Sequence, residues 1–166
     1  MRRRLERIYL EHRQGLFTMA LAITRCPAAA EDAVQEGFAR LWAAETAPRG
    51  DSVAYVFASV RNAAIDQSRR RRPASGVEQP EAASIYDGQE ADPATAAMNG
   101  ELVRRVARAV DSLPDDQRDV VVMRIYGGLT YAQIAEALGR PLPTVAGRYR
   151  LALERLRSQM GGGDER

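Results

Sequence analysis

An acidic stretch without arginine divides this sequence of 166 residues into two parts. Residues 73–99 contain five acidic residues and no arginine, whereas the flanking parts hold all 24 basic residues, every one of them arginine. Ala, Ser, Pro, Gly, Gln and Glu dominate the stretch without a sustained apolar period, so we predict a flexible linker. Residues 1–72 and 100–160 are then two small domains. Each buries only a modest core, so we expect each to gain stability from a partner. For residues 161–166 we predict a disordered tail.

Both flanking parts have apolar residues at helical spacing, and neither shows the period-two alternation of strands. We therefore predict an all-α protein of two small helical domains joined by the linker. Three helices are expected in residues 1–72, the third capped by Asp51 or Ser52. Four helices are expected in residues 100–160, with Pro114 at the first position of the second helix.

Residues 130–157 have the proportions of a helix-turn-helix motif. Thr130 and Gln133 have the spacing of a capping box, Gly139 closes the short helix, and Thr144 is expected to cap the next one. Arginines, whose guanidinium forks suit phosphates and guanine edges, gather on that last helix. The pattern favours duplex DNA binding over a plain helical hairpin with a solvated basic face. The candidate DNA-binding residues here are Thr130, Thr144, Arg148, Arg150 and Arg155.

The third expected helix carries a polar row and a basic end. Tyr55, Ser59, Asn62, Asp66 and Arg69 share one face, and Asn and Asp are poor residues for a helix interior. The helix ends in four arginines, residues 69–72, which its dipole favours only in part. A nucleic-acid backbone would account for the rest, and a solvated helix end leading into the linker is the alternative.

The composition argues against an enzyme, a cofactor or a metal site. Cys26 is the only cysteine and His12 the only histidine, which excludes an internal disulfide framework and leaves little for metal binding or imidazole catalysis. His12 falls on an apolar stripe, so we expect it to be structural. Apolar runs are too short for a membrane span, and the basic N-terminus lacks the apolar core of a signal peptide. We expect a cytoplasmic protein without membrane insertion.

Three motifs, in order along the chain, resemble the extracytoplasmic-function (ECF) group of RNA polymerase sigma factors in the sigma-70 family. The stretch from Glu31 to Trp42 is similar to the polymerase-binding part of family region 2. The stretch from Tyr55 to Asp66, with the arginines after it, is similar to the part that recognises the promoter −10 element. The segments from Leu113 to Arg118, from Gly128 to Ala135 and from Thr144 to Arg148 are similar to region 4, which reads the −35 element.

The resemblance implies a non-enzymatic initiation subunit that gives RNA polymerase its promoter choice. Its partners would be core RNA polymerase, through the β′ and β subunits, and promoter DNA, with an anti-sigma factor as a further candidate. The residues that would bind the polymerase are Asp32, Gln35, Glu36 and Arg40. The residues that would contact −10 DNA are Tyr55, Asn62, Asp66, Arg69 and Arg70.

Two departures from the family's pattern fall in the helix-turn-helix. Gln133 replaces the usual glutamate of the capping box, which a capping box tolerates. Ala146 and Gly147 replace a basic or polar pair, commonly Lys-Ser, and the glycine weakens the helix by up to ~1 kcal/mol. Either Arg148 and Arg150 carry the contact with DNA, or −35 binding is weak.

Two other readings compete with that of a sigma factor. A stand-alone helix-turn-helix regulator would form a tight dimer and bind DNA without polymerase. A sigma mimic would occupy an anti-sigma protein without supporting transcription.

Overall fold

The computed structural model describes residues 2–44, 50–71, 102 and 104–161. The first part contains α1 (Arg2–Thr24), α2 (Pro27–Ala43) and α3 (Ser52–Arg71). In the second part, residues 104–111 form a helix, followed by α5 (Asp115–Ile125), α6 (Tyr131–Leu138) and α7 (Leu142–Gly161). No strand occurs within these ranges, which confirms the predicted all-α class. The predicted linker and residues 162–166 of the predicted tail lie outside the described residues.

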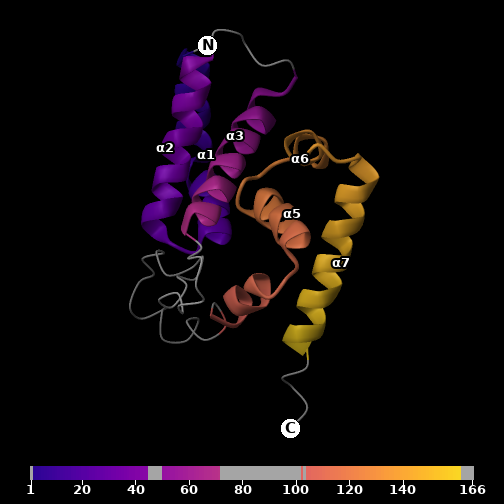
Figure 1. The fold of residues 1–166 in the computed structure, drawn as a ribbon. Coiled ribbons are helices and arrows are strands. Elements are labelled where there is room, and N and C mark those ends of the chain that lie inside the picture. The colour runs from indigo at the N-terminus through magenta and orange to yellow at the C-terminus, as the bar shows by residue number, and fades with distance from the viewer. Residues whose placement is uncertain (1, 45–49, 72–101, 103, 162–166) are drawn as a thin grey trace.

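Helices α1, α2 and α3 lie side by side as a bundle (Figure 1). Asp51 caps α3 as predicted, because its Oδ1 accepts the backbone N–H groups of Val53 at 2.8 Å and Ala54 at 2.9 Å. Gly37 allows α2 and α3 to approach closely, since a Cβ there would lie 2.9 Å from the Cα of Val60. The bundle is therefore tightly packed around its apolar faces.

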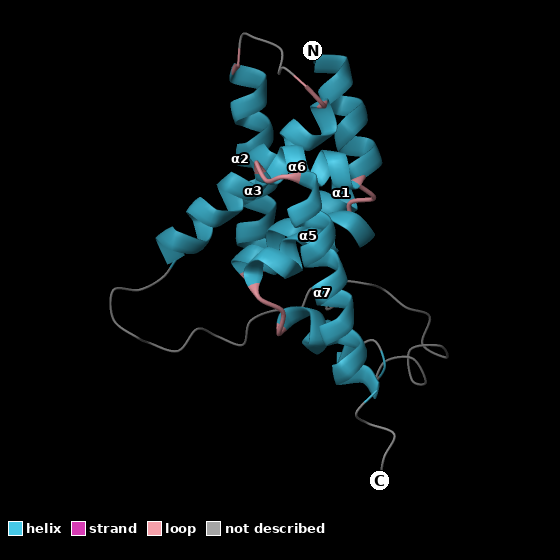
Figure 2. Cartoon of the chain, turned by 90° about the vertical axis from the view of Figure 1, so that its right-hand side faces the viewer, coloured by secondary structure: helices cyan, strands magenta, loops and turns pink. Residues whose placement is uncertain are grey.

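The second part is built around α5, with α6 and α7 forming the predicted helix-turn-helix (Figure 2). The capping box of α6 is confirmed: Thr130 Oγ1 accepts the N–H of Gln133, and Gln133 Oε1 accepts the N–H of Thr130. Gly139 ends α6 in the left-handed conformation at φ +59°, which glycine adopts without strain.

Two predicted helix starts are wrong. Helix α7 begins at Leu142, two residues before Thr144, so Thr144 lies in the first turn instead of capping the helix. Pro143 is tolerated in that turn because the first N–H groups of a helix have no intrahelical acceptor. Pro114 is the residue that precedes α5, one position earlier than expected.

The two parts share one hydrophobic core. Val120, Val122, Met123, Leu129, Ile134 and Val145 of the second part belong to the same buried cluster as the inner residues of α1, α2 and α3. His12 of α1 packs edge-on against Phe57 and donates from Nδ1 to the carbonyl of Gly127 at 3.1 Å, in keeping with its predicted structural role. Gly15 lies against Gly127 so closely that a Cβ would stand 2.7 Å from its Cα. Each part is thus stabilised by its contacts with the other.

Candidate functional surfaces

The outer face of α2 presents the residues predicted to bind polymerase. Asp32, Gln35 and Arg40 are exposed, and Glu36 is half-buried. The four residues come to one face because α2 turns its alanine and valine stripe toward the bundle.

Glu36 and Arg40 join α2 to residues of α3 that were predicted to contact −10 DNA. Arg40 donates to Glu36 at 2.5 Å and to Asp66 at 3.2 Å. Gln67 donates to Glu36 at 3.2 Å, and Arg70 lies 3.8 Å from Glu36. The hydrogen bond from Arg40 is the main cause that lowers the pKa of Glu36 below its ordinary value. This network occupies Glu36 and Arg40, and leaves Asp32 and Gln35 as the less engaged polar side chains of the face.

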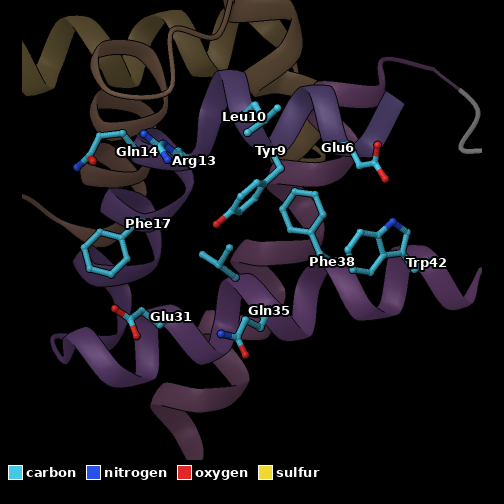
Figure 3. Close-up of a pocket in the computed structure, with 11 residues that line it drawn as sticks. Glu6, Tyr9, Leu10, Arg13, Gln14, Phe17, Glu31, Gln35, Phe38 and Trp42 are labelled. Carbon is cyan, nitrogen blue, oxygen red and sulfur yellow. The ribbon is translucent and has the colours of Figure 1, made fainter. Parts of the chain in front are cut away.

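Beside this face lies an apolar groove of about 930 Å³ between α1 and α2, in the part of the chain that the structure describes (Figure 3). The ring of Phe38 stands at its centre, with Tyr9 edge-on at 5.4 Å and Trp42 at 6.3 Å between ring centroids. Trp42 is 52% exposed and Leu10 is 68% exposed. Gln35 lines the groove as well. Apolar side chains of this size on a surface indicate an interaction site, which the sequence analysis did not identify.

Helix α3 presents most of its predicted polar row to solvent. Tyr55, Asn62, Arg69 and Arg70 are exposed, whereas Asp66 is half-buried beside Arg40. The hydroxyl of Ser59 donates to the carbonyl of Gly37 at 3.0 Å, so this member of the row has a structural task.

The helix-turn-helix presents its basic residues unevenly. Thr130, Thr144, Arg150 and Arg155 are exposed. Arg148 is half-buried, and its Nε donates to Asp116 at 3.1 Å. Arg150 and Arg155 are thus the more accessible arginines of the predicted −35 set.

Among the contacts between the parts that the sequence analysis missed, two involve α3 and its N-cap residue. Arg61 of α3 donates from Nε and Nη2 to Oδ2 of Asp119 on α5, at 2.9 and 2.7 Å. Asp51 is bonded both to Gln133 and to Glu136 of α6. The sequence contains two slight indications of the Asp51 contact. Gln133 occupies a position where the family that this chain resembles has glutamate, and a glycine precedes Asp51.

The pair of Arg61 and Asp119 lies close to the shared core. The Asp119 side chain is 9% exposed and that of Arg61 is 27% exposed. Burial raises the pKa of Asp119 above its ordinary value, against the opposing effect of the Arg61 charge. The carboxylate therefore depends on Arg61 for its ionised form.

None of the helices in the described ranges combines the length and the apolar character that a membrane span needs. The same ranges hold no group of three or more His, Cys, Asp or Glu side chains that could bind a metal ion.

Comparison with protein families gives two matches in sequence order. Residues 8–74 match the model of sigma-70 region 2, and residues 104–156 match that of sigma-70 region 4. The matches include all the predicted site residues.

Curated relatives and solved structures agree with these matches. The ECF RNA polymerase sigma factor RpoE of Cereibacter sphaeroides is 36% identical over 137 residues, covering 79% of this chain and 72% of the relative. SigK of Mycolicibacterium vanbaalenii is 30% identical over 161 residues, covering 92% and 80%. In a complex with the cytosolic domain of CnrY, CnrH superposes with a TM-score of 0.69 at 22% identity, covering 99% of this chain and 92% of CnrH.

A sigma factor RpoE solved with the anti-sigma factor NepR from Bartonella quintana gives a TM-score of 0.66 at 20% identity, covering 97% and 98%. These two solved structures share the fold, and the curated relatives share the sequence over both helical parts. The chain belongs to the ECF family of RNA polymerase sigma factors.

Proposed function

We propose that this sigma factor, a promoter-specific subunit of transcription initiation, binds core RNA polymerase through the outer face of α2. The observation that carries the proposal is the exposed pair Asp32 and Gln35 beside the apolar groove that contains Trp42. Polar side chains give a protein interface its register, and an aromatic pocket supplies apolar contact. The role is one of binding and positioning without catalysis, and it locates the protein in the cytoplasm with the polymerase.

The −10 element would lie along α3. Tyr55 offers an exposed ring on which a base of single-stranded DNA can stack. Asn62 can hydrogen-bond a base edge, and Arg69 and Arg70 can bind phosphates at the end of the helix. Asp66 would act indirectly, by orienting Arg40.

The −35 element would be read by α7. Arg150 and Arg155 are exposed and can bind phosphates or guanine edges. Arg148 would first have to release Asp116. Thr130 and Thr144 stand at the exposed starts of α6 and α7, where hydroxyl groups can bind phosphate.

An anti-sigma factor is the further partner that we propose. Two solved proteins of this fold are bound to the cytosolic domain of CnrY and to the anti-sigma factor NepR. The groove between α1 and α2 gives such a partner an apolar surface on this chain.

The test is binding of the double variant Asp32→Ala and Gln35→Ala to purified core polymerase, by co-elution in gel filtration. We expect wild type to co-elute and the double variant to lose binding while its helical circular dichroism is unchanged, since both side chains are exposed. A matched control replaces Glu154 and Gln159, exposed residues of α7, with alanine. Normal binding of the double variant would refute the assignment of α2. Absence of binding by wild type, with sequence-specific DNA binding as a dimer, would favour a stand-alone regulator.

A further inference from the structure

The N-terminus of α3 and the N-terminus of α6 meet in one hydrogen-bonded cluster. Asp51 uses Oδ1 to cap α3, and its Oδ2 accepts a hydrogen bond from Nε2 of Gln133 at 3.2 Å. The capping bonds, above all that from the N–H of Ala54, lower the pKa of Asp51, which keeps this carboxyl ionised at neutral pH. Asp51 therefore offers a negatively charged acceptor to α6.

Gln133 is suited to this acceptor in a way that glutamate is not. Its Oε1 completes the capping box by accepting the N–H of Thr130, and its Nε2 remains free to donate to Asp51. A glutamate would complete the same capping box, but it has no donor and would face the Asp51 carboxylate with a like charge. The departure at position 133 thus creates a bond between the two parts.

Glu136 makes a second bond in the same place. Its Oε1 accepts the backbone N–H of Asp51 at 2.9 Å. The approach requires glycine at position 50, because a Cβ there would overlap Glu136 Oε1, and because Gly50 has φ +96°. Two features of the sequence, Gly50 and Gln133, therefore serve one contact between α3 and α6.

This contact holds together two helices that must separate to bind a promoter. Elements centred at −10 and −35 are about 25 base pairs apart, which is about 85 Å along B-DNA. In the structure α3 and α6 are in direct contact and lie next to one another (Figure 1). The 32 residues between Arg71 and Arg104 could reach up to about 110 Å when extended, so the connection allows separation.

We propose that Asp51, Gln133 and Glu136 form a latch that holds the free chain closed, with α3 and α6 together, so that the two promoter elements cannot be engaged at once. The pair of Arg61 and Asp119 reinforces the closure between α3 and α5. Only the consequence for promoter binding rests on the proposed function; the latch itself is a property of the free chain.

The test is a mutant cycle on the free, full-length chain. Fluorescent donor and acceptor dyes are attached at Glu11→Cys on α1 and Ser158→Cys on α7, both exposed, with Cys26→Ser to remove the native thiol. Energy transfer is followed against urea in the parent, in D51N, in Q133E and in D51N/Q133E. An asparagine at position 51 still caps α3, and a glutamate at position 133 still completes the capping box, so local helix structure is kept.

We expect Q133E to reduce the ratio of closed to open chain on the order of tenfold, seen as loss of energy transfer at lower urea. In D51N/Q133E the donor and acceptor are exchanged, since the amide introduced at position 51 can donate to the carboxylate introduced at position 133, and the parent's midpoint should return. Q159E makes the same change of charge at an exposed site of α7. Gln159 bonds to Ser112 within the second part, and the Ser112 hydroxyl can still donate to a carboxylate, so this variant should not shift the midpoint. An equal effect of Q133E in the parent and in the D51N background, or no effect, would overturn the latch. Because no polymerase is present, this outcome is independent of whether the chain binds polymerase.

Discussion

Helices α3 and α7 are both 20 residues long, yet α3 buries seven of its residues and α7 buries two. Helix α3 is enclosed by α1, α2 and α6, whereas α7 contacts α5 and α6 on one side only. The inner residues of α1, α2 and α3 make up most of the shared core. Most buried residues of the second part pack against the first part. Its separate buried cluster, within the described residues, consists of Leu113, Val121 and Ala152. The side of α7 that faces away from α5 and α6 is therefore accessible to a binding partner.

The largest loss of stability should come from the side chain on which both parts pack. Phe57→Ala removes a fully buried ring of α3 that contacts His12 and lies behind Gly127. We expect the free energy of unfolding to fall by about 3–5 kcal/mol, measured by urea denaturation. Tyr55→Ala removes a 42% exposed ring from the same helix and should cost less than about 1 kcal/mol. Equal losses would contradict the view that α3 supports both parts.

Removal of the charge that faces Asp119 should make stability depend on pH. Arg61→Met leaves the buried carboxyl without its counter-charge, at a cost of about 2–3 kcal/mol near neutral pH. Burial already raises the pKa of Asp119, and loss of Arg61 raises it further. For an acid with a raised folded pKa, stability is full below the unfolded pKa and is lost as pH rises through the folded pKa.

The measurement for Arg61→Met is the free energy of unfolding at about pH 3 and at about pH 8, on either side of the expected window. The difference between variant and wild type should be small at the lower pH and larger at the higher one. Arg150→Met, at an exposed position, is the matched control and should give a constant small difference. An equal difference in the free energy of unfolding between Arg61→Met and wild type at both pH values would show that ionised Asp119 does not need Arg61.

Gly15→Ala should separate the two parts rather than unfold α1. Alanine favours the helix by up to ~1 kcal/mol, but its Cβ would meet the Cα of Gly127 and the carbonyl of Tyr126, both at 2.7 Å. Backbone atoms cannot yield as side chains do, so we expect a net loss of about 1–2 kcal/mol. Chemical denaturation followed by circular dichroism measures it. A gain in stability would mean that the two parts do not press together at this glycine.

Gly147→Ala should give the smallest effect, and with the opposite sign. No atom lies within 4 Å of a Cβ at this position in α7. The variant should gain about 0.5–1 kcal/mol through helix propensity. Gly139→Ala, also with free space but at φ +59°, is the control and should lose stability. The pair separates backbone conformation from packing, and a loss at Gly147 would show that α7 is more enclosed than its two buried residues indicate.

Local features of the fold could be predicted from sequence because local residues determine them. The apolar stripes indicate the helix class, Asp51 indicates the start of α3, and Thr130 with Gln133 indicates the start of α6. The predicted start of α7 is wrong because the sequence does not distinguish a proline in the first turn of a helix, as Pro143 is, from a proline that precedes a helix. The predicted site residues remain predictions, although most of them are exposed as binding residues must be.

The packing of one part on the other could not be predicted from the sequence. Gly15 and Gly127 meet across 112 positions, and nothing in either local pattern indicates the other. The sequence does not distinguish Arg61 from the many surface arginines, and only the structure shows its contact with Asp119. The apolar groove was missed because Tyr9, Phe38 and Trp42 fall on the apolar stripes of their helices. Phe38 is buried as that pattern predicts, but the rings of Tyr9 and Trp42 remain exposed to solvent.

The shared core also has a consequence for how the protein is made. Synthesis runs from the N-terminus at roughly 5–20 residues per second, so α3 leaves the ribosome several seconds before α7 is complete. During that interval Phe57 and its neighbours have no second part to cover them. We expect the N-terminal bundle to provide the surface on which α5 and α6 later pack, and a nascent chain halted within residues 72–130 to present this uncovered apolar surface to chaperones.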